Sequence, residues 1–416
     1  MNYNTFEFLR KISYERTGGT KKELNCANQI IEEVKKRGIV PTMEGFLVDT
    51  PLIEVARFEV LEPEYKEYVV TGYGMSGSTP KEGIIADFKY IEDGSDINLL
   101  DVEGKIVLIN GGMGYDLYKK LVEKKVAGFV SMSGTIYDDP NNTDLEERKL
   151  RERHYCNGKI PGVTMRILDA HKLVLTNPTK VRLTLIEQEL QSESHNVIAT
   201  IEGTDKKNEV IAFTAHYDSV RFSTGAYDNG TGSTTILELF NYFMDHKPSR
   251  TLKFIWCGSE EMGLLGSKAY VKTHEAELKD YVLNINVDMT GVVLGYDIAC
   301  CTTENSGVEI VNALGKEIGF AIRAKQGVYS SDSTPFADKC VPAISFARIS
   351  PMGGARIHSR LDVIDFLDED NYYKTCGFIE AFATKMANSV ILPIPKTMPD
   401  NMKKELDKYL GRNKEN

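Results

Sequence analysis

The second half of this 416-residue chain alternates apolar, strand-like runs with helix-like segments, and this pattern limits its fold more than any other feature. The strand-like runs include EVIAFTAH, TLKFIWCG, YVLNINVD and VPAISFAR, while STTILELFNYFMD and NSGVEIVNALGKEIG have helical periodicity. Strands that alternate with helices form mainly parallel sheets covered by helices. We therefore predict an α/β fold with a mainly parallel, mixed sheet and helices on both faces, ending in a helix from Glu369 to about Asn388.

The middle of the chain has a different texture. Short β-rich pieces such as KEYVVTGYG and GKIVLING are separated by Gly, Pro and Asp turns, with one helical piece, YDLYKKLVEKKVAG. Residues 1 to about 45 have helical periodicity. Since a single core rarely grows to this chain length, we expect more than one domain. The predicted division is a main domain from residues 1–47 and 189–395, a small β-rich α/β domain inserted at 48–188, and a polar C-terminal tail at 396–416.

The composition limits the partners and the compartment. No apolar run approaches the roughly 18 residues of a membrane span, and the chain start shows no secretory signal, so we expect a soluble, cytoplasmic protein. The net charge of −10 is spread along the chain, which argues against nucleic acid or a membrane as partner. The seven cysteines lack C-x-x-C spacing, so we expect free thiols.

Metal-ligand residue types follow the predicted strands or lie in the loops between them. In open α/β sheets the carboxyl ends of the strands carry the functional groups, so we expect these residues to converge at one edge. The residues in question are His216, Asp218, Asp228, Glu260, Glu261, Asp288 and His358.

Two imidazoles and three carboxylates suit a pair of zinc ions that share one bridging carboxylate. Asp228, Glu261 and Asp288 supply three negative charges, and a hydroxide would supply the fourth needed to balance two dications. Glu260 is then surplus as a ligand and would act on the proton of the attacking water, because neighbouring residues at a strand end point in different directions.

Each of these residues also has an ordinary structural explanation when taken alone. Asp228 in YDNGTG suits a turn, Glu260 and Glu261 suit a helix N-terminus, and Asp288 suits a helix cap. The ordered set of ligands plus a surplus carboxylate, each after a strand or in a glycine-rich loop, favours the metal site.

Five segments in order carry a family resemblance: AHYDSV, GAYDNGTGS, GSEEMGLLGS, NVDMTG and HSRLDVID. From about Asn196 to Pro393 the chain resembles the co-catalytic zinc aminopeptidases of the glutamate carboxypeptidase and transferrin receptor superfamily. The resemblance implies that His216 and Asp288 bind one zinc ion, that Glu261 and His358 bind the other, that Asp228 bridges them, that Glu260 is the general base, and that Asp218 orients His216. Residues 48–188 resemble, less strongly, the protease-associated domain of such enzymes.

The sequence departs from the family in two places. Ile357 stands where the family commonly has a tyrosine that donates to the oxyanion, and Ser333 stands where relatives often have histidine. Stabilisation of the oxyanion would then come from zinc itself or from a residue such as Tyr329 or Arg356.

The predicted function is a zinc-dependent exopeptidase, an aminopeptidase that hydrolyses N-terminal residues of peptides. A carboxypeptidase or dipeptidase of the same fold is the alternative, with Arg348 and Arg356 as candidates to hold a free carboxylate. A non-catalytic peptide-binding module is the third alternative. Self-association into a homo-oligomer is left open.

Overall fold

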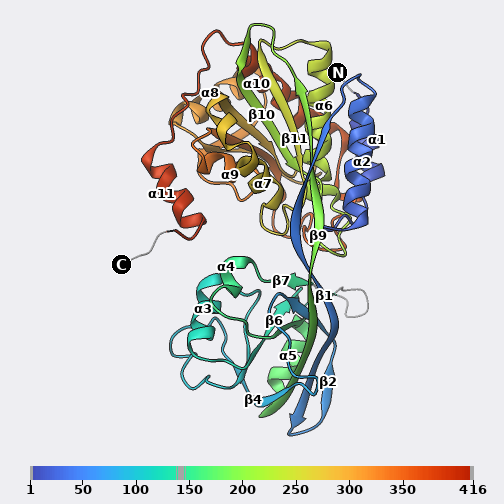
Figure 1. Ribbon diagram of the computed structural model, residues 1–416, viewed down its shortest axis with the longest axis vertical. Coiled ribbons are helices and arrows are strands. Elements are labelled where there is room, and N and C mark those ends of the chain that lie inside the picture. Colours follow the sequence, from blue (N-terminus) through green and yellow to red (C-terminus); the bar gives the residue numbers. More distant parts are fainter. Residues whose placement is uncertain (1–2, 137, 139–144, 146, 413–416) are drawn as a thin grey trace. The chain divides into compact units, whose positions relative to one another are not determined.

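The computed structural model describes residues 3–136, 138, 145 and 147–412 (Figure 1). The chain divides into two compact units: unit 1 is Met1–Val48 with Glu193–Asn416, and unit 2 is Asp49–Ser192. The chain passes from one unit to the other within the two longest strands, β1 (Thr42–Glu62) and β9 (Lys180–Ile201).

Unit 1 contains a mixed sheet with the strand order β14-β13-β15-β12-β10-β11-β9. The pairings β10–β11, β10–β12, β12–β15 and β13–β14 are parallel, whereas β9–β11 and β13–β15 are antiparallel. This confirms the predicted mainly parallel α/β sheet. Besides β9, its strands are β10 (Lys206–His216), β11 (Arg250–Cys257), β12 (Tyr281–Val287), β13 (Tyr296–Thr302), β14 (Ile322–Gln326) and β15 (Ala343–Ile349).

Helices cover both faces of this sheet, because neighbouring residues of its strands point to opposite sides. On one face Phe213 and Phe254 pack with helices α1, α2, α6, α8 and α10; on the other, Ala212 and Ile255 pack with α7 and α9. The helices are α1 (Thr5–Ile12), α2 (Lys21–Lys35), α6 (Thr231–Asp245), α7 (Leu265–Thr273), α8 (Asn305–Ile318), α9 (Ser333–Asp338) and α10 (Glu369–Asn388), the last as predicted.

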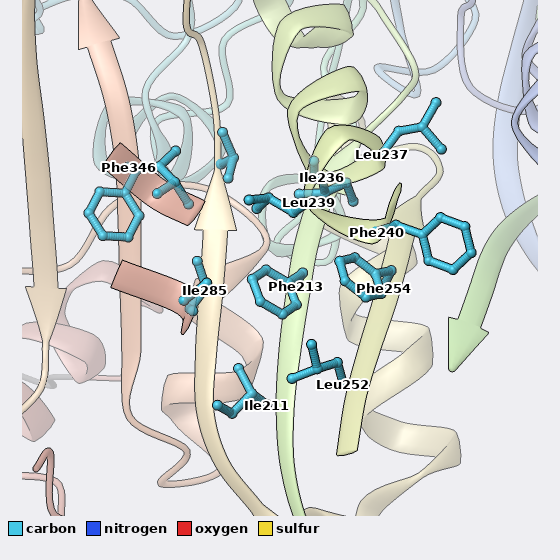
Figure 2. Close-up of a cluster of buried hydrophobic side chains, with 14 of the residues drawn as sticks. Ile211, Phe213, Ile236, Leu237, Leu239, Phe240, Leu252, Phe254, Ile285 and Phe346 are labelled. Atoms are coloured by element: carbon cyan, nitrogen blue, oxygen red, sulfur yellow. The ribbon is translucent and has the colours of Figure 1, made fainter. Parts of the chain in front are cut away.

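The core under α6 holds the central strands in place. Figure 2 shows side chains of α6, such as Leu239 and Phe240, lying over Phe213, Phe254 and Ile285 of three neighbouring strands. The rings of Phe213 and Phe254 stack with their centroids 4.7 Å apart. Because this core locks the strands side by side, the positions of their carboxyl ends are set by apolar packing rather than by the polar residues found there.

Unit 2 has a smaller sheet in the order β9-β4-β5-β6-β8-β3-β7, with β2 paired to β1. Its further strands are β2 (Lys66–Tyr68), β3 (Val70–Gly74), β4 (Ile84–Tyr90), β5 (Ile106–Leu108), β6 (Gly128–Ser133), β7 (Arg148–Lys149) and β8 (Gly162–Arg166). Its helices are α3 (Tyr115–Glu123), α4 (Glu152–Tyr155) and α5 (Ile167–Leu175).

Some sequence predictions about local structure were wrong. The helical N-terminal region ends earlier than residue 45, since β1 begins at Thr42, and unit 2 contains α4 and α5 in addition to the single predicted helix. Helix α5 buries Ala170 and Leu173, which provide too short an apolar pattern to be recognised alone.

Two more findings concern the C-terminal region and membranes. The C-terminal tail contains helix α11 (Asp400–Tyr409), which buries Met402 and Leu406 in a cluster with Met398, Ala337 and Ala343; residues 413–416 lie outside the described part. Among the described residues, no helix combines the length and the apolar character needed to cross a membrane.

Unit 2 should lose stability in acid through His154. This imidazole is buried against Tyr115 and Tyr118, and burial, followed by the charge of Arg153, lowers its pKa to about 4. Because the folded-state pKa is depressed, the stabilising contribution is present above the unfolded pKa of about 6.5 and is lost as the pH falls toward 4.

Between pH 7 and pH 4 we expect the free energy of unfolding of unit 2 to fall by up to about 3 kcal/mol in the wild type through this histidine. In His154→Phe the fall should be much smaller. Hydrogen exchange of peptides covering residues 115–133, corrected for the intrinsic effect of pH, would measure it. His171→Asn, a change at an exposed histidine, should behave like the wild type. An unchanged acid dependence in His154→Phe would contradict the prediction.

Candidate metal centre

The polar residues predicted from the sequence follow strands of unit 1 that pair in parallel. His216 is the last residue of β10, and Asp288 comes directly after β12. Glu260 and Glu261 lie in the turn between β11 and α7, and His358 lies in the loop after β15. Because parallel strands end at the same edge of a sheet, these side chains all start from one edge.

Two groups of candidate metal ligands form at this edge. In the first, His216 Nε2 lies 3.2 Å from Asp228 Oδ1 and 3.7 Å from Asp288 Oδ1. In the second, His358 Nε2 lies 3.1 Å from Asp228 Oδ2 and 3.0 Å from Glu261 Oε2. Asp228 therefore belongs to both groups and turns one carboxylate oxygen toward each. The structure brings the five predicted ligands together around this shared carboxylate.

The backbone around Asp228 is held by another acid, Asp362. One oxygen of the Asp362 carboxylate accepts a hydrogen bond from the Tyr227 amide at 2.7 Å, and the other accepts one from the Asp228 amide at 3.0 Å. Asp362 is buried and does not cap the following helix α10, whose N-terminus is capped by Asp368. The irregular turn before α6 is thereby held so that the Asp228 side chain faces both histidines.

Asp218 lies behind His216 and also holds the turn that carries the two glutamates. Its Oδ1 atom lies 3.4 Å from His216 Nδ1. The same carboxylate accepts hydrogen bonds from the Glu260 amide at 2.9 Å and from the Glu261 amide at 3.2 Å. One buried acid thus links the first histidine to the backbone of the glutamate pair.

Glu260 stands beside the two groups and belongs to neither. Its Oε2 atom is 4.0 Å from His216 Nε2, and the residue is buried. Burial, together with the nearby charges of Glu261, Asp332 and Asp288, raises the pKa of Glu260 well above its ordinary value, while His216 opposes this shift. A carboxyl group in such surroundings binds a proton more readily than one in water.

The histidines respond to the same concentration of negative charge. Burial lowers the pKa of His216, but Glu260 and three aspartates outweigh it and raise the pKa well above its usual value. Burial also lowers the pKa of His358, but the effects of Glu261 and Asp228 are larger and raise it to about 12. The pKa of Asp228 is lowered, against the effect of burial, by the two histidines. The site stabilises positive charge strongly, which is what a site for divalent cations requires.

The side chains fit zinc in distance and in chemistry. Ligand atoms bound tetrahedrally at about 2.0–2.2 Å from a zinc ion lie roughly 3.3 Å from one another. The four histidine–carboxylate distances in the two groups run from 3.0 to 3.7 Å. In addition, Glu261 Oε1 and Asp288 Oδ1 are buried without a hydrogen-bond partner among the described residues. A buried carboxylate oxygen without a donor is costly unless a cation satisfies it.

Sequence reasoning missed several acids that surround these groups, namely Glu23, Asp332 and the supporting role of Asp362. Asp332 is fully buried, and neither of its carboxylate oxygens has a hydrogen-bond partner in the described part of the chain. Burial raises its pKa to about 7. A sequence signal existed only for Glu23, which precedes the buried residues Cys26, Ala27 and Ile30 by three, four and seven positions and so lies on the apolar face of α2.

Comparison with known proteins decides the family. Residues 196–382 match the model of peptidase family M28. The chain contains a peptidase family M28 domain. This confirms both the resemblance carried by the five sequence segments and the class of enzyme, a hydrolase of peptide bonds. The five candidate ligands and Glu260 all lie within the matched residues.

Three relatives illustrate the match. Aminopeptidase YwaD of Bacillus subtilis is 28% identical over 358 residues, which are 83% of this chain and 74% of YwaD. Carboxypeptidase Q of Bos taurus is 26% identical over 246 residues, 55% of this chain and 52% of that protein. The solved structure of BSAP, a zinc aminopeptidase from Bacillus subtilis, superposes with a TM-score of 0.78 at 23% identity, covering 95% of this chain and 98% of that one. The last likeness confirms the fold.

Because Asp228 belongs to both ligand groups, we can predict which of two ligand variants loses more zinc. Asp228→Asn removes a charge that faces both groups, whereas Asp288→Asn removes a charge from the first group alone. We therefore expect Asp228→Asn to lose more bound zinc than Asp288→Asn at the same free zinc concentration. Zinc content after dialysis against a zinc buffer, measured by elemental analysis, tests this order.

Asp407→Asn, a change of a surface aspartate in α11, is the control and should keep the wild-type zinc content. Equal zinc loss in the two site variants would contradict the sharing of Asp228.

Proposed function

We propose that this chain is a zinc-dependent aminopeptidase that removes residues from the amino end of peptides. The observation that carries the proposal is the pair of histidine–carboxylate groups joined through Asp228, with the buried Glu260 next to them. That arrangement has a place for cations and a separate carboxylate for proton transfer. The names of YwaD and BSAP as aminopeptidases support the same activity.

In this proposal the site holds two zinc ions. His216 and Asp288 would hold the first ion, Glu261 and His358 would hold the second, and Asp228 would serve both. The two groups of ligand atoms and the two separate oxygens of Asp228 support this count. When bound, zinc supplies Lewis acidity, which acidifies water and polarises the carbonyl of the scissile bond.

Glu260 is the proposed general base. It would take a proton from the attacking water and later donate it to the amine that leaves, so a carboxylate near the ions but not bound to them is required. Asp218 would keep His216 in one orientation and hold the backbone amides of both glutamates.

The proposed specificity for the amino end of the peptide rests on the negative charge of the site. A free ammonium group suits a site rich in buried acids, whereas a free carboxylate needs a cationic side chain. Of the two arginines considered for that task, Arg348 donates to Asp297 at 2.7 Å and to the Val292 carbonyl at 2.8 Å. Those bonds occupy the guanidinium of Arg348, which argues against this arginine as the group that holds a free carboxylate.

A carboxypeptidase or dipeptidase remains the second candidate, because Carboxypeptidase Q is also a relative of this chain.

The donor to the oxyanion is proposed to be Tyr329 rather than the residue before His358. That residue, Ile357, has no polar side-chain atom and is 38% exposed. Burial, followed by the nearby charges of Asp288 and Asp228, raises the pKa of Tyr329 well above its usual value, so its phenol stays protonated and able to donate. Both aspartates belong to the ligand groups, and their effect on Tyr329 supports a position for it on the side of the site.

The remaining assignments are proposals of the same kind. Unit 2 would be a protease-associated domain that shapes access for longer peptides, and the protein would act in the cytoplasm. Residues 1–47 and 189–395 would be the catalytic domain. The oligomeric state is left open.

Substitution of each adjacent glutamate in turn distinguishes the proposed general base from the proposed zinc ligand. Glu260→Gln keeps the shape and the proposed ligands but removes the proton acceptor, so zinc content should stay near wild type while kcat falls by about a hundredfold to ten-thousandfold. Glu261→Gln should lose zinc together with activity, and excess zinc should restore part of it. Turnover and zinc content measured on the same samples distinguish the two. Two active, fully metallated variants would refute the assignment.

Blocked peptides test which end is attacked. A peptide with a free amine and an amidated carboxyl end should be cleaved at its first bond, and its N-acetylated counterpart with a free carboxylate should not. Mass spectrometry of the products identifies the released residue. Release of the C-terminal residue from the acetylated peptide would instead establish the carboxypeptidase alternative.

A further inference from the structure

The turn that carries Glu260 and Glu261 is held by a second carboxylate, Glu23, which comes from the N-terminal helix α2. Glu23 is buried, with 1% of its surface exposed. Its Oε1 atom accepts hydrogen bonds from the Ser259 amide at 2.9 Å and from the Ser259 hydroxyl at 3.1 Å. The Ser194 hydroxyl of β9 donates to the same oxygen at 2.8 Å.

Glu23 and Asp218 divide the backbone of this turn between them. Glu23 accepts from the amide of Ser259, and Asp218 accepts from the amides of Glu260 and Glu261. Three successive amide groups therefore point at two buried carboxylates. Because each of these amides has its own buried acceptor, this arrangement restricts the backbone from which both glutamates project.

The conformation of the turn needs such support. Ser259 has a φ of 53°, in the left-handed region that a residue with a side chain adopts reluctantly. Gly258, just before it, leaves little room: a Cβ atom there would lie 2.5 Å from the His195 carbonyl oxygen and 2.9 Å from Glu23 Oε1. The turn is therefore closely enclosed by β9 and α2, and Glu23 supplies its acceptor.

Capping of the α2 N-terminus explains the hydrogen bond of only one of the two carboxylate oxygens of Glu23. Thr20 caps α2 by accepting from the Glu23 amide at 3.3 Å, and Glu23 Oε2 reaches back to the Gly19 amide at 2.7 Å, much as in a capping box. Capping uses one carboxylate oxygen. The other oxygen makes no contact with α2 and is bonded to the two serines described above.

We propose that Glu23 is a positioning residue of the peptidase centre, which sets the orientation of Glu260 and Glu261 through the Ser259 amide. The proposal rests on the proposed function for the roles of those glutamates. It also extends the functional site beyond residues 196–382, since Glu23 lies outside the segment that matches the family. Burial, followed by the nearby charge of Asp218, raises the pKa of Glu23 to about 8.

Glu23→Gln tests this role with little change of volume. A glutamine offers one oxygen in place of two, so either the Ser259 amide or the Gly19 amide loses its acceptor. We expect zinc affinity to fall by about 10- to 100-fold, as for other residues that hold metal ligands from behind. With zinc at saturation, kcat should stay well below wild type while KM changes little, because the misplaced group acts on proton transfer rather than on peptide binding.

Ile30→Ala is the matched control, because Ile30 is a fully buried residue of the same helix and belongs to a core cluster that contains no residue of the turn. It should lower the thermal midpoint at least as much as Glu23→Gln but leave zinc affinity and kcat of the folded protein at wild-type values. Zinc affinity is measured by competition with a chromophoric chelator, and the midpoint by circular dichroism.

Two results would overturn the proposal: wild-type zinc affinity and kcat in folded Glu23→Gln, or an equal loss of both in Ile30→Ala. The zinc measurement also separates this proposal from the proposed function. If the wild-type protein cleaves no peptide, the function is wrong, whereas weaker zinc binding in Glu23→Gln alone still supports the positioning role.

Discussion

The confinement of negative charge at one edge of the unit 1 sheet is the constraint on which the rest of the site depends. Asp218, Asp228, Glu260 and Asp288 are all buried there, and isolated carboxylates cannot be buried without compensation. Part of the compensation comes from backbone amides, which donate to Asp218. The remaining charge faces two histidines and leaves carboxylate oxygens without a donor among the described residues, an arrangement that the proposed cations would complete. The fold tolerates this arrangement because its stability comes from the apolar core between the sheet and its helices.

The site residues that could be predicted from the sequence are those that directly follow a strand, because the end of the strand fixes where they lie. His216 and Asp288 follow apolar strands, and parallel strands bring their carboxyl ends together, so their convergence needed no structure. The same holds for the order of strands and helices in unit 1, including helix α10 at Glu369–Asn388.

The supporting residues could not be found in that way. Glu23 and Asp332 come from segments whose place beside the site depends on how α2 and the loop before α9 pack, and no local pattern records such packing. Asp362 has a sequence context that fits a helix cap, and only the structure shows it accepting from the amides of Tyr227 and Asp228. The ligands are local features of strand ends, whereas the residues that orient them are set by tertiary contacts.

The proposed site holds one zinc ion on either side of Asp228. Crystals of the zinc-loaded protein, measured with X-rays above and below the zinc absorption edge, would show whether it does. We expect two anomalous peaks, one within bonding distance of His216 and Asp288 and the other of Glu261 and His358, with one Asp228 oxygen bound to each. A single peak, or zinc bound without Asp228, in crystals of protein that cleaves peptides would contradict it.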